Sequence, residues 1–337
     1  MTGARAGRHV PAVGTVDRRA PGLFGRWVAG ARPRTLPAAL VPVVVGTAAA
    51  HPFVQLVDGR GGPTGTGGAA AQLGRVAGAL VVALAVQVGT NFANDYSDGT
   101  RGTDAGRVGP LRLVGSGLAS PRSVKAAALV SFGVAAVAGL ALAAATSWWV
   151  VAVGAACLAA GWLYTGGPRP YGYLGLGEAF VFVFFGLVAT EGTFYVETGR
   201  LSAGGPLAGA VAAGLLAAAL LDANNLRDLD GDAAAGKRTL AVRMGRRRAG
   251  VLTAALLVVP FAVVALWALV AVPGAPSTRV AIGPFLPLVA VPLAAVPVRL
   301  ATGPAAGRDL LPLLGATARL QLVVGLLLAA GLWLATP

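Results

Sequence analysis

Two short segments hold six of the chain's 13 acidic residues. The first segment carries Asp95, Asp98 and Asp104, and the second carries Asp228, Asp230 and Asp232. Each segment directly follows a long apolar stretch, where neighbouring carboxylates repel one another unless a cation is held between them. The pattern therefore predicts a cation site at the mouth of a helix bundle.

Amide side chains accompany both groups of carboxylates at helical spacing. If a helix continues through Asp98, one of its faces carries Asn91, then Asn94 or Asp95, and then Asp98. The second segment repeats the spacing with Asn225, Asp228 and Asp232, whereas Asp230 points away into solvent. Because the two stripes lie about 130 residues apart, we expect them to face each other as two halves of one site.

Carboxylate and amide oxygens, with no His or Cys nearby, suit Mg²⁺ better than zinc or copper. Mg²⁺ binds one or two carboxylates and completes its octahedron with water and phosphate oxygens, so two stripes predict two or three ions clamping a diphosphate. The candidate metal ligands are Asn94, Asp95, Asp98, Asp104, Asn225, Asp228 and Asp232, and the catalytic carboxylates among them are Asp95, Asp98, Asp228 and Asp232. Ordinary Asp-rich turns are the alternative interpretation, and the recurrence of the pattern in so acid-poor a chain argues against it.

The composition indicates that the helices that position the acidic motifs belong to a membrane protein. Of the 337 residues, 56% are hydrophobic and 12% are charged, whereas soluble domains carry about 25% charged residues. Spans of roughly 20 apolar residues predict membrane-crossing helices. The candidate spans are 34–53, 74–94, 123–145, 147–165, 174–196, 206–224, 249–272, 281–298 and 309–336. We therefore expect an all-α bundle of about nine transmembrane helices around a central cavity that opens near the cytoplasmic side.

The basic residues predict the orientation of this bundle. If the N-terminus is cytoplasmic, 22 Lys and Arg residues flank the cytoplasmic ends of the spans and four lie on the opposite side. This asymmetry follows the positive-inside rule, so we expect a multi-pass protein of the cell membrane with both acidic segments in the cytoplasm. We therefore attribute the net charge of +14 to contact with the membrane surface, and we expect no nucleic-acid partner. Residues 1–26 are predicted to form a basic disordered tail, and residues 27–337 one transmembrane domain.

The two acidic motifs resemble those of the UbiA superfamily of intramembrane prenyltransferases. The matching runs are Asn94-Asp95-x-x-Asp98 with Gly102-x-Asp104, and Asp228-x-x-x-Asp232. Two further runs, 164–171 (Tyr-Thr-Gly-Gly-Pro-Arg-Pro-Tyr) and 236–245 (beginning Gly-Lys-Arg-Thr-Leu), resemble the menaquinone-pathway branch of that superfamily. The resemblance implies Mg²⁺-dependent transfer of a polyprenyl group from its diphosphate to 1,4-dihydroxy-2-naphthoate, with loss of CO₂ and diphosphate.

Other polar residues near these motifs are candidates for binding substrate. Cationic side chains beside the carboxylates are well placed to contact phosphate oxygens, and the resemblance places Tyr164 at the mouth of the site. The substrate-binding candidates are Asn91, Arg101, Tyr164, Arg169, Arg227, Lys237 and Arg32. For Tyr164 an interfacial aromatic role is the alternative, and for Arg32 it is anchoring to the membrane surface.

Two other functions compete with this interpretation. Another member of the same superfamily could use a different aromatic acceptor, such as 4-hydroxybenzoate. A cation-coupled transporter would place its acids near the bilayer midplane, but these lie at the ends of the predicted spans. Of the two acids inside the fifth span, Glu178 lies near enough to the cytoplasmic end to reach the site, and Glu191 approaches the far interface. The expected partners are the two substrates and the bilayer, with no obligate protein partner.

Overall fold

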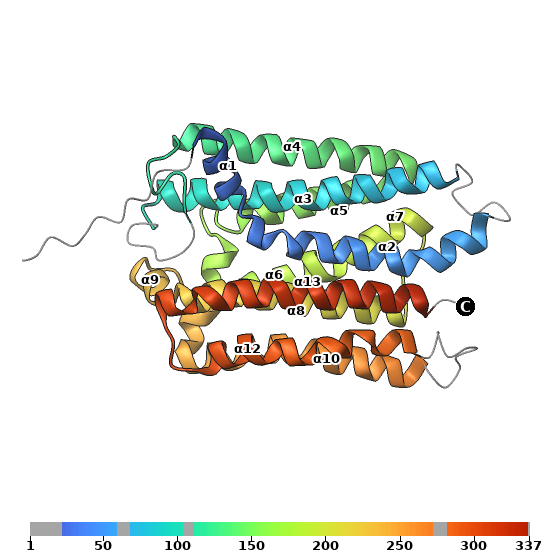
Figure 1. The fold of residues 1–337 in the computed structure, drawn as a ribbon. Helices are drawn as coiled ribbons and strands as arrows, with labels where there is room; N and C mark the ends of the chain where they lie inside the picture. The colour runs from blue at the N-terminus through green and yellow to red at the C-terminus, as the bar shows by residue number, and fades with distance from the viewer. Residues whose placement is uncertain (1–21, 59–67, 104–110, 272–281, 336–337) are drawn as a thin grey trace, which may run out of the picture.

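The computed structural model describes residues 22–58, 68–103, 111–271 and 282–335, with the side chains of 52–58 and 69 excepted. These residues form helices and their connections, with no strand among them. The helices are α1 (Leu23–Ala31), α2 (Pro37–Asp58), α3 (Ala69–Thr100), α4 (Pro121–Ala145), α5 (Trp149–Leu163), α6 (Gly177–Val181), α7 (Ala189–Thr198), α8 (Gly205–Arg227), α9 (Leu229–Ala234), α10 (Leu240–Ala271), α12 (Val291–Thr302) and α13 (Leu311–Leu334). Most run side by side as one bundle (Figure 1).

The prediction of about nine spans is confirmed as an approximate count. Seven helical segments of the described chain are long and apolar enough to cross a membrane, including Gly177–Thr198, in which a π-helical turn joins α6 to α7. An eighth is a pair of helical segments, Leu23–Thr35 and Pro37–His51, bent by 54°. The remaining predicted span corresponds to α5, which has 15 residues and is about 22 Å long. It is shorter than the bilayer's hydrocarbon core of about 30 Å.

The bend between α1 and α2 follows from the local sequence. Arg32 ends α1 in a left-handed conformation with φ of 55°. Pro33 directly after it and Pro37 at the start of α2 lack the N–H that a continuous helix requires. The start of α1 at Leu23 also means that the last residues of the predicted disordered tail are helical. The reason is packing: Trp27 of α1 contacts Phe92 edge-on, with ring centroids 5.8 Å apart.

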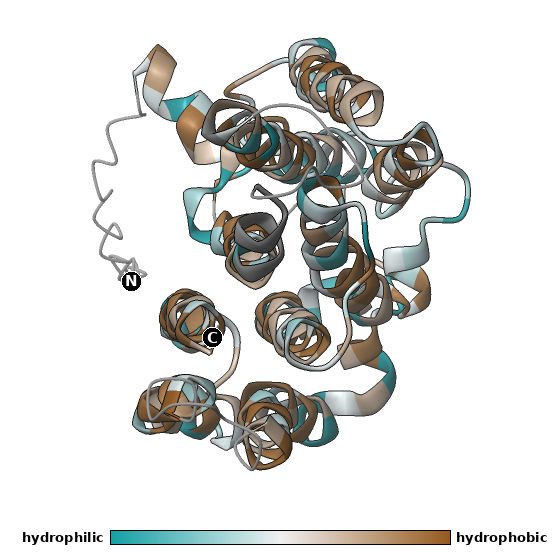
Figure 2. Ribbon diagram, turned by 90° about the vertical axis from the view of Figure 1, so that its right-hand side faces the viewer, coloured by the Kyte–Doolittle hydropathy of each residue, from teal (hydrophilic) through white to brown (hydrophobic). Residues whose placement is uncertain are grey.

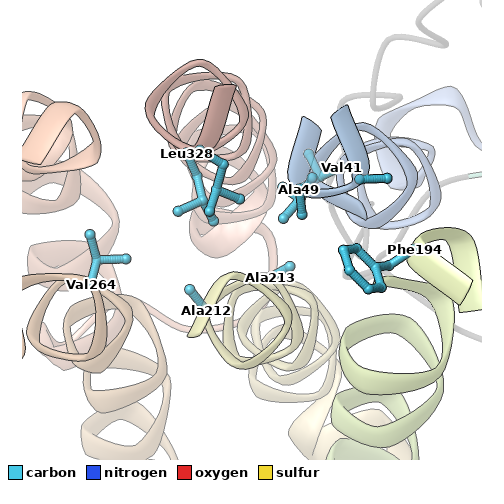
Figure 3. Packing of buried hydrophobic residues seen from close by; sticks show 10 residues of the cluster. Val41, Ala49, Phe194, Ala212, Ala213, Val264 and Leu328 are labelled. Atoms are coloured by element: carbon cyan, nitrogen blue, oxygen red, sulfur yellow. The ribbon is translucent and has the colours of Figure 1, made fainter. Parts of the chain in front are cut away.

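Small residues allow close helix packing around α8. In the apolar part of α8, 67% of the residues are buried, against 28% in the apolar parts of α4 and of α10. The helix α8 therefore lies at the centre of the bundle. A Cβ added to Gly186 would lie 2.4 Å from the Cα of Gly214 in α8, which only glycine permits. Figure 3 shows a core cluster in which α2, α7, α8, α10 and α13 converge, through Val41, Ala49, Phe194, Ala212, Ala213, Val264 and Leu328.

Apolar side chains also cover the outside of the bundle. Exposed examples include Val130 and Val137 on α4 and Leu266, Leu269 and Val270 on α10, and Figure 2 shows apolar residues on helices all around the bundle. A surface of this kind is stable in lipid rather than in water, so the chain is an integral membrane protein. The end of the bundle that carries α9 and the end of α3 is called the motif end below; the C-terminus lies at the opposite end (Figure 1).

Candidate active site

A cavity of about 530 Å³ extends from the motif end into the bundle. Polar side chains line it at the motif end, including Asn91, Asn94, Asp98, Asn225, Asp228, Asp232 and Lys237. Deeper in the bundle its walls are apolar, with Ala79, Val82, Val86, Leu142, Val150 and Val188 among the lining residues. The cavity therefore combines a polar mouth with an apolar interior.

The helical stripe predicted for the first motif is present. Because α3 continues to Thr100, Asn91, Asn94 and Asp98 recur on one face and all three line the cavity. The Asn91 amide donates to the Ala31 carbonyl at 2.9 Å and to the Thr35 hydroxyl at 3.0 Å. Asn91 therefore holds the bend between α1 and α2 against the cavity wall.

Asp95 does not lie with the other carboxylates, contrary to the sequence-based prediction. Its buried carboxylate accepts backbone N–H groups from Leu113 at 2.7 Å and from Val114 at 3.1 Å. The following loop folds back over this side of α3, which lies about 100° around the helix from Asn94. Asp95 therefore fixes the loop, and the structure does not place it among the cavity-lining metal candidates. Asp104 lies outside the described residues.

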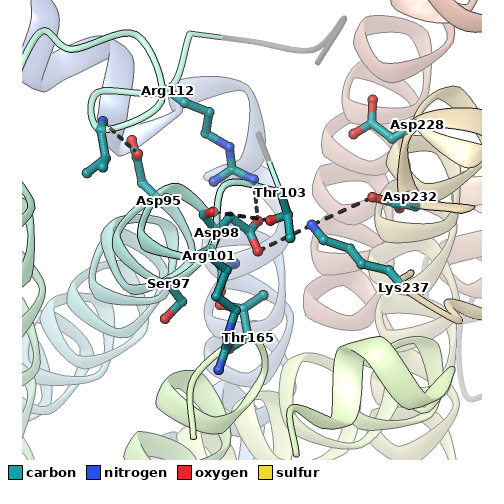
Figure 4. A network of polar contacts seen from close by, with 12 residues as sticks. Asp95, Ser97, Asp98, Arg101, Thr103, Arg112, Thr165, Asp228, Asp232 and Lys237 are labelled. Carbon is teal, nitrogen blue, oxygen red and sulfur yellow. Dashed lines mark hydrogen bonds and ion pairs between the residues drawn. The ribbon is translucent and has the colours of Figure 1, made fainter. Parts of the chain in front are cut away.

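Asp98 is the centre of a network that joins the two motifs (Figure 4). Its carboxylate lies 3.2 Å from Lys237 Nζ and 3.2 Å from Arg112 Nη2, and it accepts a hydrogen bond from the Tyr173 hydroxyl at 2.5 Å. Lys237 Nζ also lies 3.6 Å from a carboxylate oxygen of Asp232. One ammonium group thus connects the first motif to the second.

Arg112 and Tyr173 were not predicted from the sequence. Both lie in connecting segments, and only their closeness to acidic and glycine-rich runs could have suggested a role. Burial raises the pKa of Tyr173, and the charge of Asp98 raises it further, so its hydroxyl stays protonated and can donate to Asp98. Tyr164 lines the cavity, and its ring contacts that of Tyr171 edge-on, with centroids 5.5 Å apart.

The second motif does not form one continuous helix as its spacing predicted. The central helix α8 ends at Arg227, and α9 begins at Leu229. At the junction, the Asp228 carboxylate accepts two hydrogen bonds from the neighbouring Arg227 guanidinium, at 2.7 and 2.8 Å. The backbone leaves the helical range at Asp228, where φ is −89° and ψ is 6°. Asn225, Asp228 and Asp232 nevertheless all line the cavity.

The remaining predicted substrate-binding residues separate into two groups. Arg32 lines the cavity, and so do Lys237 and Tyr164. Arg101 instead donates to the carbonyls of Thr165 and Gly167, so it fixes the turn after α5. Arg227 is paired with Asp228 and does not line the cavity, and Arg169 is exposed outside it. The structure therefore does not bring Arg101, Arg169 and Arg227 to the cavity surface.

The donor atoms at the mouth fit Mg²⁺. Asn94, Asp98, Asn225, Asp228 and Asp232 offer carboxylate and amide oxygens on opposite walls of one cavity, the ligand type that this ion prefers. In the described part of the chain, no three His, Cys, Asp or Glu side chains group closely enough to hold an ion by themselves. Lys237 and Arg112 add positive charge beside Asp98.

A membrane bundle with an acidic mouth and an apolar interior is suited to a lipid-like substrate with a charged head. The chain belongs to the UbiA prenyltransferase family, which it matches over residues 61–310, and it is a membrane prenyltransferase. It is 48% identical to a 1,4-dihydroxy-2-naphthoate octaprenyltransferase of Mycobacterium tuberculosis, over 92% of this chain and 97% of that relative. It is 32% identical to the Escherichia coli protein of that name, over 65% of this chain and 68% of the relative.

Solved structures confirm the fold. A UbiA homolog from Archaeoglobus fulgidus bound to GPP and Mg²⁺ superposes with a TM-score of 0.58 at 18% sequence identity, covering 93% of this chain and 100% of that one. A UbiA homolog from Aeropyrum pernix gives a TM-score of 0.56 at 14% identity, covering 86% of this chain and 96% of that one. At these identities the likeness concerns the helical architecture.

Proposed function

We propose that this protein transfers a polyprenyl group from a polyprenyl diphosphate to 1,4-dihydroxy-2-naphthoate, releasing diphosphate and CO₂ and giving a demethylmenaquinol, the reduced form of demethylmenaquinone. The observation that carries the proposal is the 48% identity to a 1,4-dihydroxy-2-naphthoate octaprenyltransferase over nearly the whole of both chains. The cavity supports it, because a polar mouth lies above an apolar interior that accommodates an isoprenoid tail.

The mouth of the cavity holds the diphosphate in this proposal. Mg²⁺ bound by Asn94, Asp98, Asn225, Asp228 and Asp232 would neutralise the diphosphate and improve it as a leaving group. Asp95 contributes indirectly, by fixing the loop that carries Arg112.

Two cationic side chains contribute to binding beside the ions. Lys237 and Arg112 present positive charge at the mouth and contact phosphate oxygens directly. Tyr173 holds the Asp98 carboxylate in place through its hydroxyl. These residues place and neutralise the leaving group without forming a covalent bond to the substrate.

The deeper walls protect the reacting carbon. Departure of diphosphate leaves an allylic cation, which water would quench, and the apolar lining excludes water from this region. The electron-rich naphthoate ring then attacks the allylic carbon, and the carboxylate of the substituted ring carbon leaves as CO₂. Arg32 and Tyr164 line the mouth, where Arg32 pairs with the acceptor's carboxylate.

We also propose that the motif end faces the cytoplasm and that the protein resides in the cell membrane. The asymmetry of 22 Lys and Arg against four supports this orientation. Soluble naphthoate acceptor then reaches the cavity mouth from the cytoplasm. The transmembrane domain of residues 27–337 together with the end of the preceding tail, which starts α1, forms the enzyme.

An acceptor competition tests the proposal. Purified protein receives Mg²⁺, a polyprenyl diphosphate, and equal amounts of 1,4-dihydroxy-2-naphthoate and 4-hydroxybenzoate, with the naphthoate carboxylate labelled. We expect the naphthoate to be prenylated preferentially and the label to be released as CO₂. Retention of the label in the lipid product, or preference for 4-hydroxybenzoate, would refute the assigned acceptor while leaving the family assignment intact.

A further inference from the structure

A buried glutamate, Glu178, is hydrogen-bonded to Asn225 of the second motif. Glu178 of α6 is 6% exposed, and its Oε1 accepts a hydrogen bond from Nδ2 of Asn225 at 2.8 Å. Glu178 itself is absent from the cavity lining, whereas Asn225 is part of it. Ionisable groups within membrane-spanning segments are costly and are retained where they have a function. Glu178 therefore lies one hydrogen bond away from the cavity lining.

A second buried acid supports Glu178 from the other side. Asp222 and Asn225 are three residues apart on α8, so both point toward α6. Asp222 is fully buried, its carboxyl group lies within hydrogen-bonding reach of that of Glu178, and its Oδ2 accepts from the Thr253 hydroxyl at 2.6 Å. The polar chain thus runs from α10 through α8 and α6 to the cavity wall.

The hydrogen bond between Glu178 and Asn225 fixes which end of the amide faces the cavity. A carboxylate oxygen can only accept a hydrogen bond, whereas the amide has an N–H₂ end that donates and an oxygen end that accepts. Because the N–H₂ end of Asn225 is directed to Glu178, its Oδ1 is the end left for the cavity. Without Glu178 the amide could turn over, and it would then present N–H groups to a cation.

We propose that Glu178 is a positioning residue for the metal–diphosphate site, because it holds the Asn225 amide with its oxygen toward the cavity. This inference rests on the proposed function, in which Asn225 is one of the Mg²⁺ ligands. Residues that orient a metal ligand in this way typically change metal affinity by about 10- to 100-fold when they are replaced.

The test is a binding measurement on the purified full-length protein in detergent or nanodiscs. Mg²⁺ is titrated at a fixed concentration of inorganic diphosphate, and binding is followed as the rise in the thermal unfolding midpoint. For Glu178→Leu we expect the apparent Kd for Mg²⁺ to rise by about 10- to 100-fold relative to the unchanged protein. For Glu178→Gln we expect a value close to the unchanged one, since the Gln oxygen accepts from Asn225 while its amide donates to Asp222.

Glu191→Leu is the matched control. It removes a second glutamate from the same span, 13 residues further along, where the carboxylate accepts from the Ser202 backbone N–H at 3.0 Å. Because Glu191 does not line the cavity, its removal leaves the Mg²⁺ titration unchanged. In enzyme assays, Glu178→Leu should recover most of its kcat when Mg²⁺ is raised, which a general loss of structure would not allow.

Three outcomes would overturn the inference. The first is an unchanged apparent Kd in Glu178→Leu, and the second is equal impairment of Glu178→Gln and Glu178→Leu. Both leave the proposed function standing, because the unchanged protein still responds to Mg²⁺. The third is no Mg²⁺ response in the unchanged protein, which refutes the metal clamp and the role of Glu178 together. If Glu178→Leu does not fold in EDTA, Glu178→Ser replaces it, since serine is polar and too short to reach Asn225.

Discussion

Replacing Asp98 with Asn keeps the shape of the side chain and removes its negative charge. In the structure this carboxylate lies 3.2 Å from Lys237 Nζ and 3.2 Å from Arg112 Nη2, with the side chains of all three residues at most 8% exposed. At an effective dielectric constant of 20, each pair contributes about 5 kcal/mol of attraction before desolvation is subtracted. Breaking buried pairs of this kind costs about 3–5 kcal/mol net.

Two measurable effects follow from the loss of this charge. The metal-free protein should unfold at a lower temperature, because Lys237 and Arg112 lose the carboxylate that neutralises them. Prenyl transfer should fall by at least about 10²–10³-fold, the typical effect of removing one group that stabilises charge in the transition state. The assay is the formation of prenylated naphthoate by purified protein at saturating Mg²⁺, alongside a thermal unfolding curve in EDTA.

Asp230→Asn provides the control for this substitution. Asp230 lies at the same end of the bundle on α9, and it is exposed to solvent outside the cavity. Both activity and stability should therefore stay near the values of the unchanged protein. The reasoning is refuted if Asp98→Asn keeps more than about a tenth of the activity. Such a value is far above the residual activity expected after the removal of a group that stabilises charge in the transition state.

Three further predictions test other parts of the structure. Lys237→Met should raise the KM for polyprenyl diphosphate more than it lowers kcat, because its ammonium contacts phosphate; an unchanged KM in steady-state assays would contradict this role. Gly186→Ala should destabilise the bundle by about 3 kcal/mol through overpacking, since its Cβ would lie 2.4 Å from the Cα of Gly214. Gly133→Ala is the control, because a Cβ added there has no atom within 4 Å, and it should leave the thermal unfolding midpoint unchanged. Equal unfolding midpoints for the two variants would contradict the close contact between Gly186 and Gly214. In a Cys157→Ala background, Ser116→Cys and Ala234→Cys should resist an impermeant thiol reagent added outside intact cells, whereas Leu201→Cys at the far end should react; labelling of either motif-end site would reverse the proposed orientation.

Local periodicity in the sequence determined much of the site. A helix repeats every 3.6 residues, so the spacing of Asn91, Asn94 and Asp98 on α3 was enough to place them on one face. The apolar length of the segments predicted the membrane bundle, because a span needs roughly 20 apolar residues. The face of α3 that carries Asn91, Asn94 and Asp98, and most of the bundle, could therefore be predicted from neighbours within a few residues along the chain.

Contacts between distant segments decided the rest. The loop that folds back over α3 supplies the backbone N–H groups that take Asp95 out of the cavity. Tyr173 reaches Asp98 from 75 residues away, and Asn225 bonds Glu178 across 47 residues. A local pattern specifies which residues share a face, whereas the partner that each face meets depends on how the helices pack, and this only the tertiary structure decided.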